Sequence, residues 1–231
     1  MKVGIIQSNF LPWRGYFGFI REVDLFVLED DLQYTKGDWR NRNKIKTPRG
    51  PEWITVPVKY KHTKQLIQNT PIDYSTPWAR KMLNRIRESY RTAIYFEPYF
   101  SELSELLCQP AATISELNLS LIRWVCHHLE IHTPLAFSQA YHLSGAKTER
   151  VISILRQVGA KTYLSGPSGK NYIVPELFDQ AGIQLEYKEY NYPEYEQLYP
   201  PFDPAVSVLD LLFMKGTEAK LYLEYFREKQ S

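Results

Sequence analysis

The sequence has few cysteines and no long run of apolar residues. Its two cysteines, Cys108 and Cys126, form no CxxC motif, which favours buried thiols in a reducing compartment over a disulfide. No run approaches the roughly 18 apolar residues of a membrane span. The first residues indicate a strand rather than the apolar core of a signal peptide. We therefore expect a cytoplasmic protein with no membrane span.

A large excess of charge of one sign is also missing. The net charge of +2 excludes a strongly basic coat for nucleic acid. The positive charge is nevertheless uneven, because residues 36–64 hold nine Lys and Arg side chains against two acidic ones. This local excess favours a phosphate, a nucleotide or an RNA backbone as partner, although a charge run is often only a solvated face.

Several well-known catalytic motifs are absent. There is no Gly-x-Ser-x-Gly elbow, and the loop at residues 165–172 has the wrong glycine spacing for a Walker A loop. The histidines at positions 127, 128, 132 and 142 follow no zinc-binding pattern. Cys126 lies on the apolar stripe of an expected helix, where a thiol is usually inert. We therefore predict neither a metal site built from these residues nor a cysteine nucleophile.

The 231 residues, 44% of them hydrophobic and 23% charged, suit one generous globular domain. Apolar runs at residues 3–7 and 25–28 predict buried strands, joined by a short helix over residues 14–23. A strand–helix–strand unit makes a parallel sheet the default. Further strands are expected at residues 53–58, 135–137, 162–164 and 183–187, with a weaker partner for the first of these at 66–72.

Helical patterns interrupt the strands between residues 76 and 130. They predict helices at residues 77–95, 98–107 and 113–129, and later ones at 148–158, 174–181, 206–213 and 217–226. The chain is therefore predicted to be α/β, with a mostly parallel Rossmann-like sheet flanked by helices and a helical insert or cap at about residues 76–130. We expect residues 1–231 to form a single domain of this kind.

The loop after the first strand carries the first group of chemically active side chains, which are Gln7, Asn9, Trp13, Gly15 and Tyr16. A glycine among rings at a helix start lets a ligand approach backbone N–H groups, and the helix N-terminus favours phosphate. Its placement is similar to the His-x-Gly-His loop of nucleotidylyl transferases, with Trp13 and Tyr16 in the histidine positions. Alternatively, these rings only anchor the first helix.

The second strand ends in Asp30 and Asp31, followed by Gln33 and Tyr34. Adjacent carboxylates at a strand end could hold Mg²⁺, act as a base, or bind a ribose or an amine. Since neighbouring side chains of an extended segment point to opposite faces, we expect only one of the two to face a cleft. A polar strand end that caps a turn is the alternative.

A basic segment follows, with Trp39 ahead of alternating cations and amides. If it is extended, one face presents three cations and the other presents two amides; the residues are Arg40, Arg42 and Lys44, and Asn41 and Asn43. Three cations beside an aromatic ring suit a phosphate or a carboxylate ligand.

A later loop predicts an anion cradle of small residues and one lysine, formed by Ser165, Ser168, Gly169, Lys170 and Tyr172. The preceding helix opens with three residues that could contribute to the same cleft, namely Lys147, Thr148 and Arg150. Thr148 could instead be only an N-cap.

These segments in combination resemble the WbqC-like protein family. In the first half the resemblance rests on Gln7-x-Asn9-x-x-Pro12-Trp13-x-Gly15-Tyr16-Phe17, Asp30-Asp31-x-Gln33-Tyr34 and Trp39-Arg40-Asn41-Arg42. In the second half it rests on Lys147-Thr148-Glu149-Arg150, Gly159-Ala160-x-x-Tyr163, Gly169-Lys170-x-Tyr172, and Phe202-x-Pro204 leading into Val208-Leu209-Asp210. It runs from about residue 2 to residue 226.

The resemblance implies a transferase or ligase of bacterial surface-polysaccharide (O-antigen) synthesis, which adds an aminoacyl group such as glycyl to a nucleotide-activated amino sugar. Arg40, Arg42, Lys44 and Lys170 would hold the diphosphate, and Asp30 or Asp31, with Tyr16, would carry the chemistry at the amine. The expected partner is an anionic small molecule, a nucleotide sugar or a nucleotide, and bound nucleotide or Mg²⁺ is compatible with the site. Nucleic acid is not expected, except that a charged tRNA stays open as acyl donor.

Two other functions stay open. One is an ATP-dependent carboxylate ligase with a degenerate His-x-Gly-His loop, although the missing histidines would stabilise charge on a transferring phosphate. The other is a non-catalytic binding protein of the polysaccharide machinery. A single-site hypothesis requires Tyr16, Asp31, Arg40, Arg150 and Lys170 to line one pocket.

Overall fold

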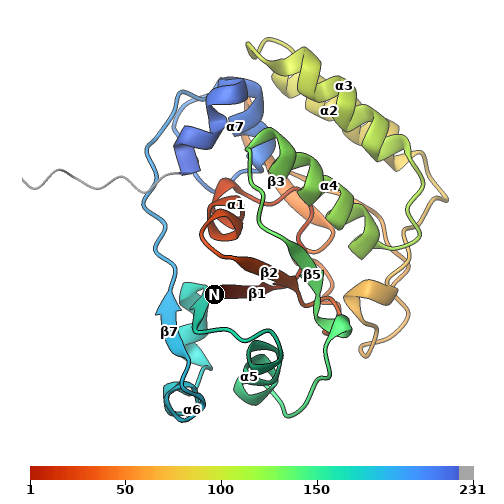
Figure 1. The fold of residues 1–231 in the computed structure, drawn as a ribbon. Helices are drawn as coiled ribbons and strands as arrows, with labels where there is room; N and C mark the ends of the chain where they lie inside the picture. The colour runs from red at the N-terminus through yellow and green to blue at the C-terminus, as the bar shows by residue number, and fades with distance from the viewer. Residues whose placement is uncertain (224–231) are drawn as a thin grey trace, which may run out of the picture.

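The structure is a computed structural model that describes residues 1–223, so the expected end of the last helix at residue 226 lies outside the described residues. Five parallel strands form a sheet in the order β5-β2-β1-β6-β7 (Figure 1). They are β1 (Lys2–Ile6), β2 (Leu25–Leu28), β5 (Leu135–Phe137), β6 (Thr162–Ser165) and β7 (Gln184–Tyr187). The predicted α/β fold with a parallel Rossmann-like sheet is confirmed.

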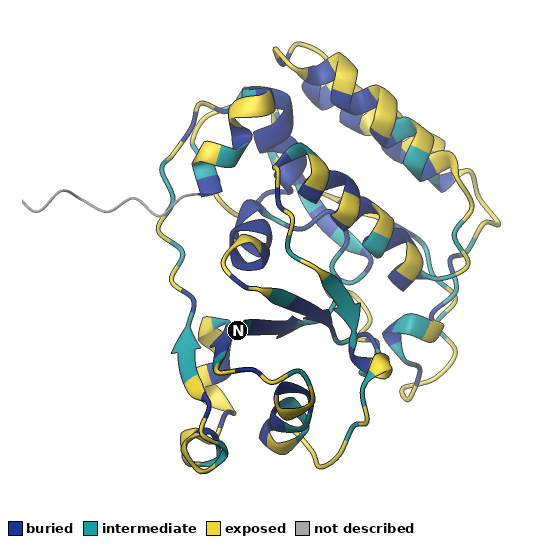
Figure 2. Cartoon of the chain, in the orientation of Figure 1, coloured by how far each residue is buried: buried dark blue, intermediate teal, exposed yellow. Residues whose placement is uncertain are grey.

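Helices cover both faces of the sheet, and the central strands are buried between them (Figure 2). One face is covered by α1 (Arg14–Arg21) and α4 (Ile114–His128), with α7 (Val208–Lys215) beyond α1, and the other by α5 (Thr148–Gln157) and α6 (Pro175–Ala181). Side chains of β2 alternate between the two faces of the sheet, since Phe26 and Leu28 belong to the core on the α1 side and Val27 to the core on the α5 side. Gly4 is required on the α1 face, because a Cβ there would lie 2.2 Å from the Phe19 ring.

The predicted helical segment at residues 76–130 contains α2 (Trp78–Tyr90), α3 (Phe96–Cys108) and α4. Thr113 caps α4, since its hydroxyl accepts a hydrogen bond from the backbone N–H of Glu116 at 3.3 Å. The first predicted helix is too long, because the backbone turns between α2 and α3 at residues 91–95. Within residues 1–223, no helix has both the length and the apolar character needed to cross a bilayer.

An antiparallel hairpin of β3 (Arg42–Thr47) and β4 (Gly50–Thr55) lies outside the main sheet. The sequence predicts neither β3 nor this pairing, because the strand buries polar side chains such as Asn43 and Lys46 instead of alternating apolar ones. The suggested partner at residues 66–72 is not a strand, since it contains the short 3-10 helix η1 (Ile67–Asn69), but its end pairs with the predicted strand through an isolated antiparallel bridge between Ile72 and Val58. The other 3-10 helices are η2 (Ser138–Ala140), η3 (Pro167–Asn171) and η4 (Gly216–Leu223), the last of which replaces the start of the expected closing helix.

Candidate functional site

A cleft of about 580 Å³ opens at the carboxyl ends of β1, β2 and β6. The chain runs from β1 outward to β2 and β5, then returns to the other side of β1 with β6 and β7. Open α/β sheets bind ligands at such a change of direction. The polar residues that line the cleft are Gln7, Asn9, Glu29, Arg40, Lys147, Thr148, Arg150, Ser165, Ser168 and Tyr172, together with Gly166.

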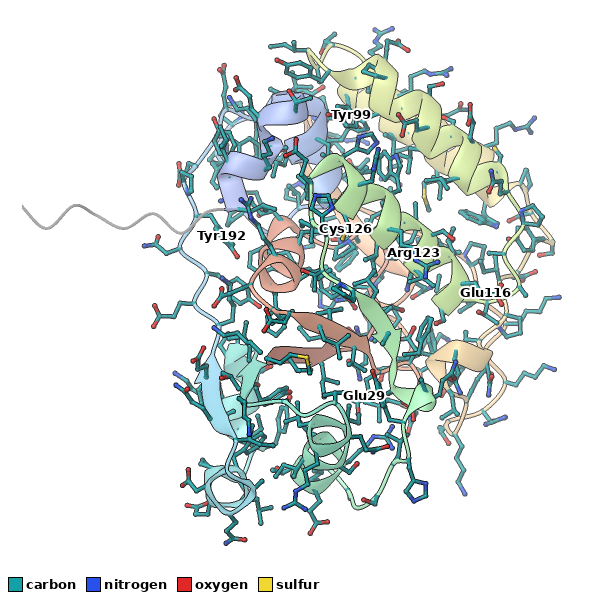
Figure 3. The ribbon with its side chains drawn as sticks, viewed as in Figure 1. Glu29, Tyr99, Glu116, Arg123, Cys126 and Tyr192 are labelled. Carbon is teal, nitrogen blue, oxygen red and sulfur yellow. The ribbon has the colours of Figure 1, made fainter. Side chains whose placement is uncertain are left out.

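Arg150, in the first turn of α5, joins two carboxylates at the cleft. Its Nε donates a hydrogen bond to Glu29 at 2.9 Å, and a terminal nitrogen donates to Asp31. Burial raises the pKa of Glu29, and Arg150 only partly offsets this. Burial also opposes the charge of Arg150, but its hydrogen bonds to Asp31 and Glu29 outweigh that effect and raise its pKa. Figure 3 shows Glu29 beyond the strand ends, on the side of the sheet toward α5.

Asp30 has a different environment from its neighbours. It is fully buried and accepts hydrogen bonds from the Ser8 backbone N–H at 2.7 Å and from the Ser115 hydroxyl of α4. It therefore fixes the loop after β1 to α4 and does not line the cleft, where the sequence placed it as a catalytic candidate. Asp31 also lies outside the lining, bound to Arg150 and to the Ser138 hydroxyl.

Glu29 is the cleft residue that the sequence reasoning missed. The signal was present in the alternation of side chains at a strand end, which gives Glu29 and Asp31 one direction and Asp30 the other. In agreement with this alternation, Glu29 and Asp31 both accept hydrogen bonds from Arg150. The adjacent carboxylates of Asp30 and Asp31 were the more conspicuous feature of the sequence, and Glu29 precedes them directly.

Arg40 enters the cleft from the loop before β3. Its guanidinium donates hydrogen bonds to the Ser8 carbonyl at 3.3 Å and to Asn9 Oδ1, and it lies 3.5 Å from Asp38. Burial lowers the pKa of Arg40, and Asp38 partly offsets this. A guanidinium nevertheless stays charged at neutral pH.

The buried side chain of Asn118 on α4 fixes the backbone around Arg40. Its amide donates to the Arg40 carbonyl at 2.9 Å and to the Ser8 hydroxyl at 3.1 Å. The backbone N–H of Phe10 also donates to the Trp39 carbonyl at 3.0 Å. These bonds hold the loop after β1 against the loop before β3, so both enter the cleft in a fixed register.

The three cations predicted to share one face are separated. Arg40 precedes β3 and turns into the cleft, whereas Arg42 and Lys44 lie over the Trp53 ring, 4.1 and 5.2 Å from its centroid. The reason is that extended backbone begins only at Arg42. The intervening Asn41 and Asn43 are buried, and their amides donate to the Val56 and Leu11 carbonyls, both at 2.7 Å.

Of the five residues in the single-site hypothesis, only Arg40 and Arg150 line the cleft. Tyr16 is buried, its hydroxyl donates to the Gln7 carbonyl at 3.1 Å, and burial raises its pKa well above the usual value. Lys170 on η3 turns its ammonium group toward the Tyr187 ring, 5.2 Å from the centroid. Neither side chain lines the cleft, although the sequence placed both there.

Several other predicted residues do not line the cleft. Gly169 packs so closely on Ser165 that a Cβ would lie 2.1 Å from the serine hydroxyl. Tyr34 is buried against Tyr60, with ring centroids 5.7 Å apart, and Gln33 forms a β-bridge with Leu66. Trp13, which covers Gly15, lines a neighbouring pocket together with Trp39.

Lys147 reaches the cleft on strained backbone. It precedes α5 with φ 50° and ψ −117°, a conformation that costs free energy for a residue with a Cβ. Such strain persists only where the surroundings impose it, and it concentrates at functional sites.

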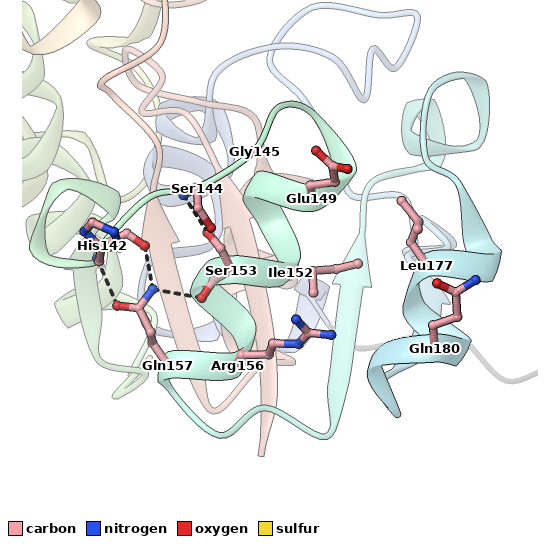
Figure 4. Close-up of a pocket in the computed structure, with 10 residues that line it drawn as sticks. All are labelled: His142, Ser144, Gly145, Glu149, Ile152, Ser153, Arg156, Gln157, Leu177 and Gln180. Carbon is pink, nitrogen blue, oxygen red and sulfur yellow. Dashed lines mark hydrogen bonds between the residues drawn. The ribbon is translucent and has the colours of Figure 1, made fainter.

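The outer face of α5 supplies that support (Figure 4). Gln157 accepts from the His142 backbone N–H at 2.9 Å and donates to its carbonyl at 2.7 Å, while the Ser153 hydroxyl accepts from the Ser144 N–H at 3.3 Å. These bonds lie in a shallow groove of about 640 Å³. Because these hydrogen bonds tie α5 to residues 142–144, we interpret this part of the groove as a support for the loop that carries Lys147.

Two other kinds of site can be assessed from the described side chains. Among residues 1–223, no group of three or more His, Cys, Asp and Glu side chains is placed to hold a metal ion. Cys126 is buried, and burial raises the pKa of its thiol to about 12, as the apolar stripe predicted.

The chain matches a recognised protein family over nearly its whole length. The sequence model described as the WbqC-like protein family matches residues 7–222. A protein of Mycobacterium tuberculosis (strain ATCC 25618 / H37Rv), named "Uncharacterized protein Rv1507c", is 44% identical over 230 residues, which are 98% of this chain and 99% of that protein. No solved structure matches the chain.

Proposed function

Because the chain belongs to the WbqC-like protein family, we propose that it is a transferase or ligase of bacterial surface-polysaccharide synthesis. Its reaction is the transfer of an acyl or aminoacyl group, such as glycyl, to the amine of a nucleotide-activated amino sugar. The observation that carries this proposal is the cleft at the switch point of the sheet, where Arg40, Lys147 and Arg150 lie around one carboxylate, Glu29.

The cationic part of the cleft suits the diphosphate of a nucleotide sugar. Arg40 and Arg150 offer guanidinium N–H groups, which bind phosphate oxygens well because they are charged and planar. Lys147 adds a third cation at the N-terminus of the ten-residue helix α5, whose field favours an anion. Ser168 adds a hydroxyl donor from the loop after β6, whereas the Ser165 hydroxyl donates to the Gly166 carbonyl at 3.1 Å.

Glu29 suits the amine. As the amine nitrogen attacks the acyl carbon, the bond from that carbon to the donor's leaving group breaks, and the nitrogen must lose a proton. Glu29 accepts this proton, and its burial-raised pKa improves it as a base near neutral pH. Arg150 positions the carboxylate through the 2.9 Å hydrogen bond. The role of base thus moves from Asp30 or Asp31 to Glu29.

The test is to incubate the protein with amine-bearing nucleotide sugars and candidate donors, and to follow the sugar by mass spectrometry. The donors are acyl thioesters, aminoacyl-tRNA, and amino acids with ATP. The proposal expects a sugar heavier by one acyl group with one donor, and no mass shift with any donor overturns it. Release of pyrophosphate from ATP without acylated sugar would identify the carboxylate ligase instead.

Variants locate the reaction in the cleft. We expect Glu29→Gln to bind nucleotide sugar and to lose at least about 100-fold in rate, in line with the usual contribution of a general base. Arg40→Met should weaken binding by about 10-fold or more through loss of a charge-assisted contact. Lys161→Met is the matched control, since this exposed lysine directly precedes β6, at the opposite end of that strand from the cleft, and it should retain activity.

A further inference from the structure

A second pocket, of about 300 Å³, lies beside the cleft and takes no part in the chemistry above. Its walls are mainly rings and other apolar groups, contributed by Pro12, Trp13, Trp39, Pro204 and Ala205. Both indoles have aromatic backing, because the centroid of Trp13 lies 4.9 Å from that of Tyr190 and the centroid of Trp39 lies 5.2 Å from that of Trp53. Two supported aromatic walls are therefore in place before any ligand binds.

The polar groups of this pocket are few. Asn43 is committed to the fold, since its amide donates to the Phe10 and Leu11 carbonyls at 3.2 and 2.7 Å and its oxygen accepts from the Lys44 N–H at 2.7 Å. Asn9 accepts a hydrogen bond from Arg40 through its Oδ1, so the amide N–H groups of the same side chain are the donors that it can offer to a ligand.

A pocket that offers the Asn9 amide and two indole rings favours a flat ligand with few polar groups. A hexose carries hydroxyls around its rim, and each of them would lose hydrogen bonds to water without a replacement here. A flat heteroaromatic ring has two apolar faces that stack on indole and only a few acceptors on its edge. The lining thus fits a nucleobase better than a sugar ring.

The pocket and the cationic cleft are neighbours. Asn9 lines both cavities. Trp39 faces the pocket while its neighbour Arg40 faces the cleft, and the hydrogen bond from the Phe10 N–H to the Trp39 carbonyl fixes this arrangement. A phosphate on Arg40 would therefore lie at the junction of the two cavities.

We propose that this pocket binds the nucleobase of a nucleoside diphosphate, whose phosphates extend along Arg40 into the cleft. The Asn9 amide donates to an acceptor atom on the edge of the base, and the sugar end reaches Glu29. This assignment rests on the proposed function, because it names the binding site for the nucleotide part of that substrate.

The experiment compares nucleoside diphosphates of the five common bases with inorganic pyrophosphate, by calorimetry and by quenching of tryptophan fluorescence. We expect at least one nucleoside diphosphate to bind about 10-fold or more tightly than pyrophosphate, as base stacking typically provides. Trp39→Ala should abolish that preference and leave pyrophosphate affinity unchanged, and Trp39→Tyr should restore much of it. Trp78→Phe, in α2 and outside the lining of both cavities, is the matched control.

The outcomes separate this proposal from the proposed function. Pyrophosphate binding that depends on Arg40, with no added affinity from any base, overturns the nucleobase pocket and leaves the cationic cleft in place. A base preference that survives in Trp39→Ala also overturns the pocket. If neither pyrophosphate nor any nucleotide binds, both proposals fail.

Discussion

Replacement of Asp30 tests whether this carboxylate supports the fold or performs chemistry. Its carboxylate is fully buried between the Ser8 N–H and the Ser115 hydroxyl. A hydrogen bond to a charged group contributes about 1.5–3 kcal/mol, so Asp30→Ala should lower the free energy of unfolding by about 3–6 kcal/mol. That is a large part of the roughly 5–15 kcal/mol that stabilises a domain.

The milder variants refine this magnitude. Asp30→Asn keeps an acceptor for Ser8 and offers Ser115 an amide donor, so it should cost about 2 kcal/mol, the difference between two charged and two neutral hydrogen bonds. Ser115→Ala removes one bond and should cost about 1.5–3 kcal/mol. In the double variant, Ser115→Ala should lower the free energy of unfolding much less than it does alone, because Asp30→Ala has already removed the hydrogen bond that the two residues share.

Urea denaturation followed by tryptophan fluorescence measures these differences, with Asp179→Ala on the exposed surface of α6 as control, expected within about 0.5 kcal/mol of wild type. The reasoning is refuted if Asp30→Ala unfolds within 1 kcal/mol of the unchanged protein. It is refuted as well if Asp30→Asn keeps full stability but loses acyl transfer, since the carboxylate would then act in the reaction.

Three further results are expected. In the native protein a thiol reagent at pH 8 should modify exposed Cys108 and spare Cys126, whose pKa is raised to about 12, and both should react in urea; rapid native labelling of Cys126 would contradict this. Because folding raises the pKa of Glu29, the free energy of unfolding should fall as the pH rises from the ordinary pKa of 4.5 through the folded one. Glu29→Gln should flatten this decline in unfolding measurements; if the variant and the unchanged protein decline in parallel, Glu29 is not its source. Asn118→Ala should lower the free energy of unfolding by about 2 kcal/mol through its two lost hydrogen bonds, as read from urea curves, whereas an unchanged midpoint would mean that the loops are held otherwise.

Much of the fold was predictable because its signals are local. Buried apolar runs gave β1 and β2, and helical spacing of apolar residues gave α4. β3 was not predictable, because its buried positions hold groups such as Asn43 and Lys46, whose partners come from distant segments. Lys46 contacts the Tyr90 hydroxyl through its backbone N–H and the Pro201 carbonyl through its ammonium, and neither contact leaves a periodic pattern.

The site was predictable in its location and less so in its members. Strand ends in a parallel sheet converge, and this placed Asn9, Arg40 and Arg150 in one cleft. Lys170 was misplaced because the loop after β6 winds into η3, and a turn of helix redirects every side chain that follows. Residue type indicates what a side chain can bind, but only the path of the backbone decides where it points.

The central position of β1 has a consequence for synthesis of the chain. β1 leaves the ribosome first, yet one of its two partners is β6, which begins only at Thr162. At roughly 5–20 residues per second, that edge of β1 waits on the order of 8–30 s for its partner. The apolar face formed by Val3, Ile5 and Val27 also waits, because α5 and α6 follow late. Fragments that end before Thr162 are therefore expected to aggregate through this open edge, and a growing chain needs protection until its second half has been made.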